Sequence, residues 1–157
     1  MAINLRQTFD DLVRFETELW NGIDARLQQE CGVTLGTFNV LLVISDTAHC
    51  RVNDLAAALS ITVGGSSQAV DRIEARGLLE RKPNPANRRS SLLELTASGR
   101  RTLESAGAVF DSELHSWFAG PLTSGALETL SQDLAKLRAA AEQRDADPQP
   151  AAENDQA

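Results

Sequence analysis

Hydrophobic residues recur every three or four positions over the first thirty residues, and this spacing predicts a long amphipathic helix. We expect it to end at Cys31 and Gly32, because glycine suits a helix C-terminus. Thr34 can cap a second helix. That helix is apolar nearly all round from residue 38 to residue 44, so we expect it to be buried. The apolar stripe of the first helix consists of Leu5, Phe9, Leu12, Val13, Leu19, Trp20, Ile23 and Leu27.

The middle of the chain predicts two short helices joined by a tight turn. Residues 46–49 read as a loop and Cys50 to Val52 as a very short strand. Apolar residues from Val52 to Leu59 follow the helical spacing and predict a third helix. After a turn at residues 60–62, a fourth helix is expected from Val63 to Arg76, ending at Gly77. Two short helices connected in this way form a helix-turn-helix motif.

A short hairpin is predicted next. Leu78 to Lys82 form a candidate strand, and Ser90 to Leu95 form the return strand. Between them, Pro83 to Arg89 read as a turn, since proline blocks helix and limits the hydrogen bonds of a ladder.

Two further helices follow the hairpin. Thr96 can cap a fifth helix, which Gly120 and Pro121 interrupt, and Thr123 can cap a sixth. The expected fold is therefore mainly α with a small β-hairpin. Its parts are a winged helix-turn-helix domain at 32–96, helical regions at 1–31 and 97–144, and an acidic tail at 145–157. The tail is rich in proline, alanine and acid, and we expect it to be disordered.

Size and composition fit a small globular protein. The 157 residues, 42% of them hydrophobic, can bury a core without disulfides or metal ions. No apolar run approaches the length of a membrane span, and the charged N-terminal segment does not resemble a signal peptide. Cys31 and Cys50 form no recognisable disulfide framework. We therefore expect a cytoplasmic protein with reduced thiols and no membrane partner.

The distribution of charge matters more than the net charge of −7, which by itself argues against a nucleic-acid partner. From Arg81 to Arg101 there are six cations and one anion, whereas residues 142–157 hold one cation and five anions. Because the local field attracts phosphate, the basic segment is compatible with DNA binding. The alternative is a solvated charged hairpin.

The fourth helix has the two faces that a DNA-reading helix needs. Val70 and Ile73, together with Ala69, are expected to face the core. A helix fits the major groove, where Gln68 can pair with adenine and Arg72 can reach guanine or phosphate. The alternative is the ordinary solvated face of an amphipathic helix. The outward positions are Ser67, Gln68, Asp71 and Arg72.

The hairpin places two arginines at its tip. Arg88 and Arg89 follow turn-forming residues, and an arginine presented there can enter a narrow, A·T-rich minor groove. The alternative is an exposed basic turn. The order helix, turn, helix, strand, basic loop, strand within about fifty residues favours the functional interpretation over the alternative.

Four segments together resemble the MarR (multiple antibiotic resistance regulator) family. They are Asp54–Leu59, Val70–Arg81, Asn84–Arg89 and Leu95–Gly99, and the specific part of the resemblance covers Val52–Glu104. The resemblance implies a homodimeric regulator that reads a pseudo-palindromic operator, with the first, fifth and sixth helices forming the dimer interface. Pairing the long apolar stripes of these helices with a second chain would also bury much apolar area.

The leading hypothesis is a repressor that binds double-stranded DNA and is released from it by a small ligand. The alternative is a winged-helix protein-interaction or scaffold module without specific DNA binding. No nucleophile–base pair, phosphate loop or acid pair suggests an enzyme, and no cofactor is expected. The candidate DNA-binding residues are Gly64, Gly65, Ser67, Gln68, Arg72, Asn87, Arg88 and Arg89.

The chain departs from the family pattern in three places. Gly64 and Gly65 open the fourth helix; either the backbone approaches a phosphate closely, or the helix begins one turn late. Ser66 takes a position that is usually apolar. Asn87 stands where the family has aspartate, so it can brace the loop only through neutral hydrogen bonds.

The family resemblance also implies an effector, a small aromatic or lipophilic compound or an oxidant. Cys31 and Cys50 are either redox sensors or, as their surroundings favour, structural thiols. The two histidines do not form a metal cluster with them. The candidate effector contacts are Trp20, Phe38 and His49.

Overall fold

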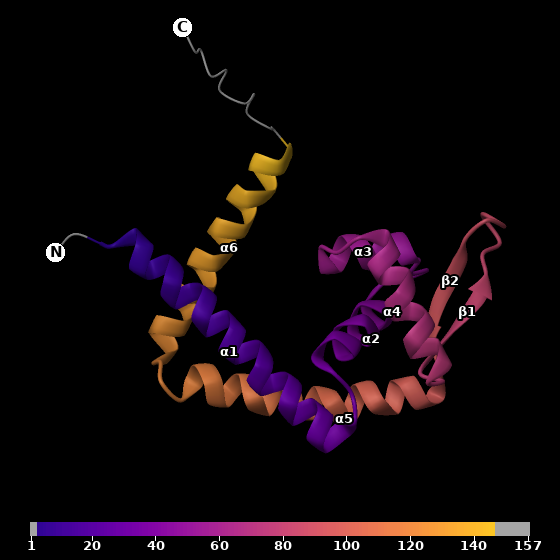
Figure 1. The fold of residues 1–157 in the computed structure, drawn as a ribbon, viewed down its shortest axis with the longest axis horizontal. Helices are drawn as coiled ribbons and strands as arrows, with labels where there is room; N and C mark the ends of the chain where they lie inside the picture. The colour runs from indigo at the N-terminus through magenta and orange to yellow at the C-terminus, as the bar shows by residue number, and fades with distance from the viewer. Residues whose placement is uncertain (1–2, 147–157) are drawn as a thin grey trace, which may run out of the picture. The chain divides into compact units, whose positions relative to one another are not determined.

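The structure, a computed structural model, describes residues 3–146 and is mainly helical with one two-stranded antiparallel sheet (Figure 1), as the sequence predicts. The chain divides between Glu113 and Leu114 into two compact units. The first unit contains α1 (Leu5–Cys31), α2 (Leu35–Asp46), α3 (Val52–Leu59), α4 (Val63–Ala75), β1 (Leu79–Pro83), β2 (Ser91–Leu95) and α5 (Ala97–Leu114), whose last residue opens the second unit. The second unit contains η1 (His115–Ala119) and α6 (Ser124–Ala146).

The predicted end of α1 and the predicted start of α2 are confirmed, whereas Asp46, which was expected in the following loop, is the last residue of α2. Gly32 caps α1 in the left-handed conformation with φ 66°, and the Thr34 hydroxyl accepts a hydrogen bond from the Thr37 amide. The expectation that α2 is buried all round is wrong at Leu42, which is exposed. The helix packs against α1, α3, α4 and β2, and these neighbours cover only part of its circumference.

The helix-turn-helix motif is confirmed as well. Leu55 of α3 and Val70 of α4 are fully buried, and Ser60 makes the turn between the helices with φ 53°. The short strand expected at Cys50 to Val52 is not formed, because Val52 already belongs to α3. Cys50 contributes one backbone hydrogen bond, accepted by its carbonyl from the Leu93 amide at 2.8 Å.

The hairpin has a simple register. Leu79 pairs with Leu95 at one end of the ladder, and Pro83 pairs with Ser91 at the other. The sequence places Pro83 in the turn, whereas the structure makes it the last residue of β1. A strand end is a position where proline's missing amide costs little.

The second unit contains a feature that the sequence does not reveal. After Leu114 the chain continues as a π-helical turn, His115–Ala119, before reaching Gly120. Thr123 then caps α6, accepting a hydrogen bond from the Ala126 amide. The helix reaches Ala146, and residues 147–157, where most of the expected tail falls, lie outside the described residues. Among the helices from residue 3 to residue 146, none is long and apolar enough to cross a membrane.

Candidate nucleic-acid interface

The helix α4 presents a polar face outward, as predicted. Val70 and Ile73 are buried, whereas Gln68 and Arg72 are exposed and Ser67 is half-buried. Polar side chains that can contact base edges therefore lie on one side of a helix whose other side belongs to the core.

The start of α4 is regular. The helix begins at Val63, so the late start considered for the two glycines does not occur. Thr62 is the N-cap, and its hydroxyl accepts a hydrogen bond from the Gly65 amide at 3.0 Å. A Cβ atom at Gly65 would lie 3.1 Å from that same hydroxyl oxygen, whereas one at Gly64 would meet nothing within 4 Å. The cap therefore explains Gly65, but packing does not explain Gly64.

Ser66 is an unusual residue for its position. It is fully buried beneath the first turn of α4, and its Oγ has no hydrogen-bond partner in the described structure. A buried hydroxyl without a partner costs free energy. The polar residue at a position expected to be apolar thus weakens the seating of this end of the helix.

Arg81 of β1 fixes the hairpin to α4. Its guanidinium donates to Asp71 at 2.6 Å and also pairs with Glu74, whose other carboxylate oxygen accepts from the Arg81 amide at 3.2 Å. Partial burial lowers the pKa of Arg81, but the hydrogen bonds and charges of the two acids outweigh it and raise that pKa. Asp71 is therefore occupied within the protein.

Lys82 is neutralised in a similar way. Its ammonium lies 2.6 Å from Glu94 and 3.4 Å from Glu80, and hydrogen bonds to these carboxylates raise the pKa of Lys82. Two of the six cations counted between Arg81 and Arg101 are thus compensated by neighbouring acids. The count of charges along the sequence overstates the positive field along strand β1.

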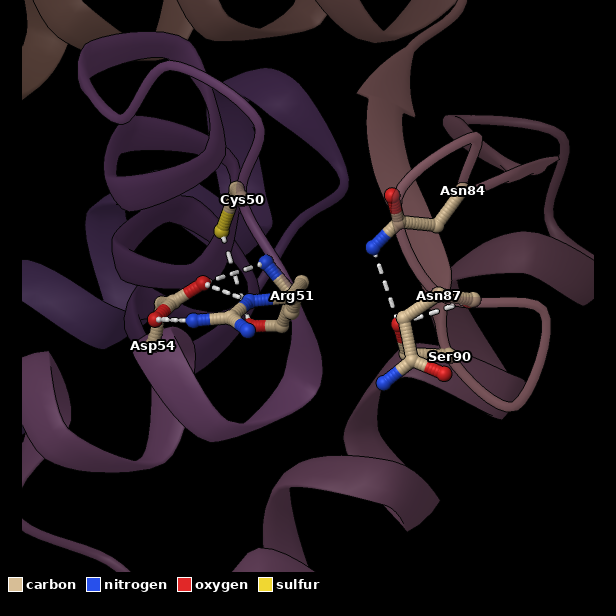
Figure 2. A network of polar contacts seen from close by, with 6 residues as sticks. All are labelled: Cys50, Arg51, Asp54, Asn84, Asn87 and Ser90. Carbon is tan, nitrogen blue, oxygen red and sulfur yellow. Dashed lines mark hydrogen bonds and ion pairs between the residues drawn. The ribbon is translucent and has the colours of Figure 1, made fainter.

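The tip of the hairpin is held by neutral hydrogen bonds (Figure 2). The Asn84 side-chain amide donates to the Ser90 hydroxyl at 2.9 Å, and that hydroxyl donates to the Asn87 carbonyl at 3.2 Å. The Asn87 side chain accepts a hydrogen bond from the Arg89 amide. Asn87 therefore braces the backbone of the turn.

Arg88 and Arg89 are exposed, and neither side chain forms an ion pair within residues 3–146. The hairpin thus has compensated cations on strand β1 and uncompensated cations in its turn. A loop of this kind presents its charge to an external anion.

The sequence reasoning missed an ion pair at the start of α3 (Figure 2). The Arg51 guanidinium donates from Nε and Nη2 to the two Asp54 carboxylate oxygens, at 2.9 and 3.0 Å, and the Arg51 amide also donates to Asp54. These hydrogen bonds raise the pKa of Arg51 and lower that of Asp54. An acid three residues after a helix cap was the available signal.

The three candidate effector contacts lie in different places. Trp20 lines a cleft of about 710 Å³ together with Thr37, Ile61, Gly65 and Arg72. His49 lines a separate cleft beside the hairpin, together with Pro85. Phe38 lines neither of these clefts, being buried against Phe110 with the ring centroids 4.9 Å apart.

The cysteines and histidines offer little chemistry. Cys50 is buried, and desolvation raises the pKa of its thiol, with a further contribution from Asp54. A raised pKa disfavours the thiolate that reacts with oxidants. Over the described part of the chain, no group of three or more histidine, cysteine or acidic residues could hold a metal ion.

Comparisons with known proteins agree with this geometry. The sequence model of the MarR family matches residues 32–90. The multiple antibiotic resistance protein MarR of Escherichia coli is 30% identical over 105 residues, covering 67% of this chain and 73% of that protein. The HTH-type transcriptional regulator BilQ of Clostridium symbiosum is 30% identical over 122 residues, covering 74% of this chain and 81% of that protein.

A solved structure extends the likeness to the fold. The crystal structure of a cysteine-to-serine variant of Escherichia coli MarR, complexed with operator DNA, has a TM-score of 0.71 and 27% identity, covering 86% of this chain and 99% of that chain. The winged helix-turn-helix geometry, the family match and the identity to named regulators lead to one conclusion: this chain belongs to the MarR family of transcriptional regulators.

Proposed function

We propose that the protein is a homodimeric repressor that binds a pseudo-palindromic operator and is released by a small ligand. The carrying observation is the contrast within the hairpin, where Arg81 and Lys82 are paired with acids while Arg88 and Arg89 are left uncompensated and exposed. The MarR variant of Escherichia coli was crystallised with operator DNA, and this supports the same kind of partner here.

Two elements would divide the work of recognition. The exposed face of α4, with Gln68 and Arg72, would enter the major groove and read base edges. Arg88 and Arg89 would reach the minor groove or its flanking phosphates. Gly64, which packing does not require, would let the start of α4 approach a phosphate closely.

Dimerisation is supported by the apolar face of α1. Leu5 is 76% exposed, Phe9 68% and Leu12 50%, all on one helix of a single chain. On α6, Leu134 and Leu137 are also exposed. Apolar residues gathered in this way mark an association surface, and a symmetric dimer would present two copies of α4 to two half-sites.

Release by a ligand is supported by the cleft that Trp20 lines. The same cleft is bordered by Gly65 and Arg72, two residues that we assign to the DNA contact. A small aromatic compound that stacks on Trp20 and pairs with Arg72 would therefore compete directly with DNA.

The first experiment selects duplexes from a randomised library with the full chain and measures binding by fluorescence anisotropy at several salt concentrations. We expect an enriched inverted repeat. The double variant Arg88→Ala with Arg89→Ala should bind it more weakly and with a shallower salt dependence. The matched control is Arg6→Ala with Arg14→Ala, which removes the same charge from two exposed arginines outside the hairpin and outside the basic segment 81–101.

The outcomes test two points: whether the hairpin contacts DNA, and whether the protein binds specific DNA at all. Unchanged affinity and salt slope in the hairpin variant, with a normal control, would remove the hairpin from the DNA contact. Failure to enrich any repeat would instead favour a protein-interaction module. Addition of aromatic compounds to the complex then tests release, and Trp20→Ala should reduce it.

A further inference from the structure

The C-terminal end of α4 is joined to the C-terminal end of α1 by one long side chain. Arg76 follows the last residue of α4, and its Nη2 donates a hydrogen bond to the Gly32 carbonyl at 2.8 Å. Gly32 is the residue that caps α1. A contact over 44 positions of the sequence thus connects the two helix ends directly.

The chemistry of this contact suits an arginine. The end of a helix carries unpaired carbonyl groups and a partial negative charge, and it favours a nearby cation. The last turn of α1 contains no basic residue of its own. Arg76, which has no ion pair among the described residues, supplies that cation from a different element.

Arg76 lies at the end of α4 about which a change in the angle of the helix relative to α1 would occur. α4 has 13 residues, which corresponds to a length of about 20 Å at about 1.5 Å per residue. A rotation of about 10° at the Arg76 end would move the Gly64 end by about 3.5 Å, close to the rise of one base pair. A small change in the angle of α4 at this contact would therefore displace the DNA-facing end of the helix by about one base pair.

We propose that Arg76 is a positioning residue that fixes the angle between α4 and α1 and thereby sets the half-site spacing that the dimer accepts. This inference rests on the proposed function, because spacing has meaning only when α1 belongs to the dimer core and α4 reads DNA. Arg76 acts here through Gly32 and does not touch DNA itself.

The experiment compares the affinity of the full chain for three duplexes, one with the selected spacing between half-sites and two with one base pair added or removed. Arg76→Met removes the hydrogen bond while keeping a long side chain, and Arg14→Met, at an exposed position outside the basic segment, is the matched control with the same loss of charge. For Arg76→Met we expect the ratio of the affinity at the selected spacing to the affinity at the altered spacings to be about tenfold smaller. This factor corresponds to one hydrogen bond to a charged group. Its salt slope and that of the control should stay alike.

Other outcomes would overturn the inference. Equal weakening at all three spacings, with a salt slope reduced by about one, would make Arg76 a phosphate contact. An unchanged preference in Arg76→Met would make the contact irrelevant to spacing. If Arg76→Met does not fold, Arg76→Lys, which keeps the charge but has a single donor group, takes its place and should show a partial loss. Absence of any DNA binding by the unsubstituted chain would instead reject the proposed function, and the inference with it.

Discussion

The two ends of α4 are held in different ways. At the C-terminal end, Arg76 is bound to the cap of α1, and the Thr96 hydroxyl donates to the Gly77 carbonyl at 2.7 Å. At the N-terminal end, one neutral cap from Thr62 holds a turn that contains two glycines and the unpartnered hydroxyl of Ser66. The end that is tied to the scaffold is firm, and the end proposed to approach DNA is loosely held.

This difference is consistent with different roles for the two ends of α4. A firmly anchored end transmits the orientation of the scaffold, while a less stable end can adjust its backbone on binding. Functional segments are commonly drawn from the less stable parts of a protein. The comparison predicts that substitutions of similar size should have opposite effects on stability at the two ends.

The largest effect is expected beside the anchored end, for Gly99→Ala in α5, because Gly99 packs against Leu78, which follows Gly77 in the chain. A Cβ atom at Gly99 would lie 1.8 Å from the Leu78 carbonyl oxygen, which is backbone and cannot rotate away. We expect a loss of about 3 kcal/mol or more in the free energy of unfolding, measured by urea denaturation. A near-neutral result would show that the backbone between α4 and β1 moves easily away from α5, against the comparison.

Ser66→Ala should have the opposite sign at the other end of α4. The substitution removes a buried hydroxyl that has no partner, and we expect a gain of about 1 kcal/mol in the same urea measurement. Ser67→Ala, one position along and half-buried, is the control and should change stability less. A loss of stability in Ser66→Ala would indicate that the hydroxyl has a partner after all.

Gly64→Ala, also at the N-terminal end of α4, should raise the free energy of unfolding slightly less than Ser66→Ala does. The site has room for a Cβ atom and lies inside the helix, so we expect a gain of about 0.5–1 kcal/mol from the better helix propensity of alanine. If the glycine serves close approach to phosphate, DNA affinity should fall while thermal stability rises. A simultaneous rise in both would reject that role for Gly64.

Much of this picture follows from local sequence rules. The caps Thr34, Thr96 and Thr123 follow from residue type, because an N-cap depends only on the residue and the turn that follows it. The cap at Thr62, which the sequence places in a turn, was missed. The helix-turn-helix and the hairpin were equally accessible, since their apolar spacing is short in range. Here local and tertiary preferences agree.

The features that sequence reasoning missed depend on distant partners. Nothing near Arg76 indicates that its side chain reaches Gly32, and nothing near Gly99 indicates that the Leu78 carbonyl excludes a side chain. The pairing of Arg81 with Asp71 and Glu74 likewise compensates one cation of the predicted basic segment. Such contacts are set by packing between elements, which composition and periodicity do not encode.

The smallest expected effect is that of Asp54→Asn on thermal stability. The first turn of α3 is held by the charged pair of Arg51 and Asp54, whereas the first turn of α4 is held by a neutral cap. The pKa of Asp54 is lowered by Arg51. The pair therefore contributes stability above the ordinary aspartate pKa of about 3.9, and this contribution is lost as the pH falls through the lowered pKa. Asp54→Asn should lower the melting temperature by about 1 °C at pH 7, because surface pairs contribute little.

Thermal melts from pH 7 to pH 2.5 test this pH dependence. The difference between the unsubstituted chain and Asp54→Asn should shrink as Asp54 becomes protonated. In an Arg51→Met background the effect of Asp54→Asn should already be smaller at pH 7 and vary less with pH, since the partner that lowers the pKa is gone. A difference that stays constant down to pH 2.5 would mean that the carboxylate charge does not stabilise α3. The start of α3 and the start of α4 would then both depend on neutral caps alone.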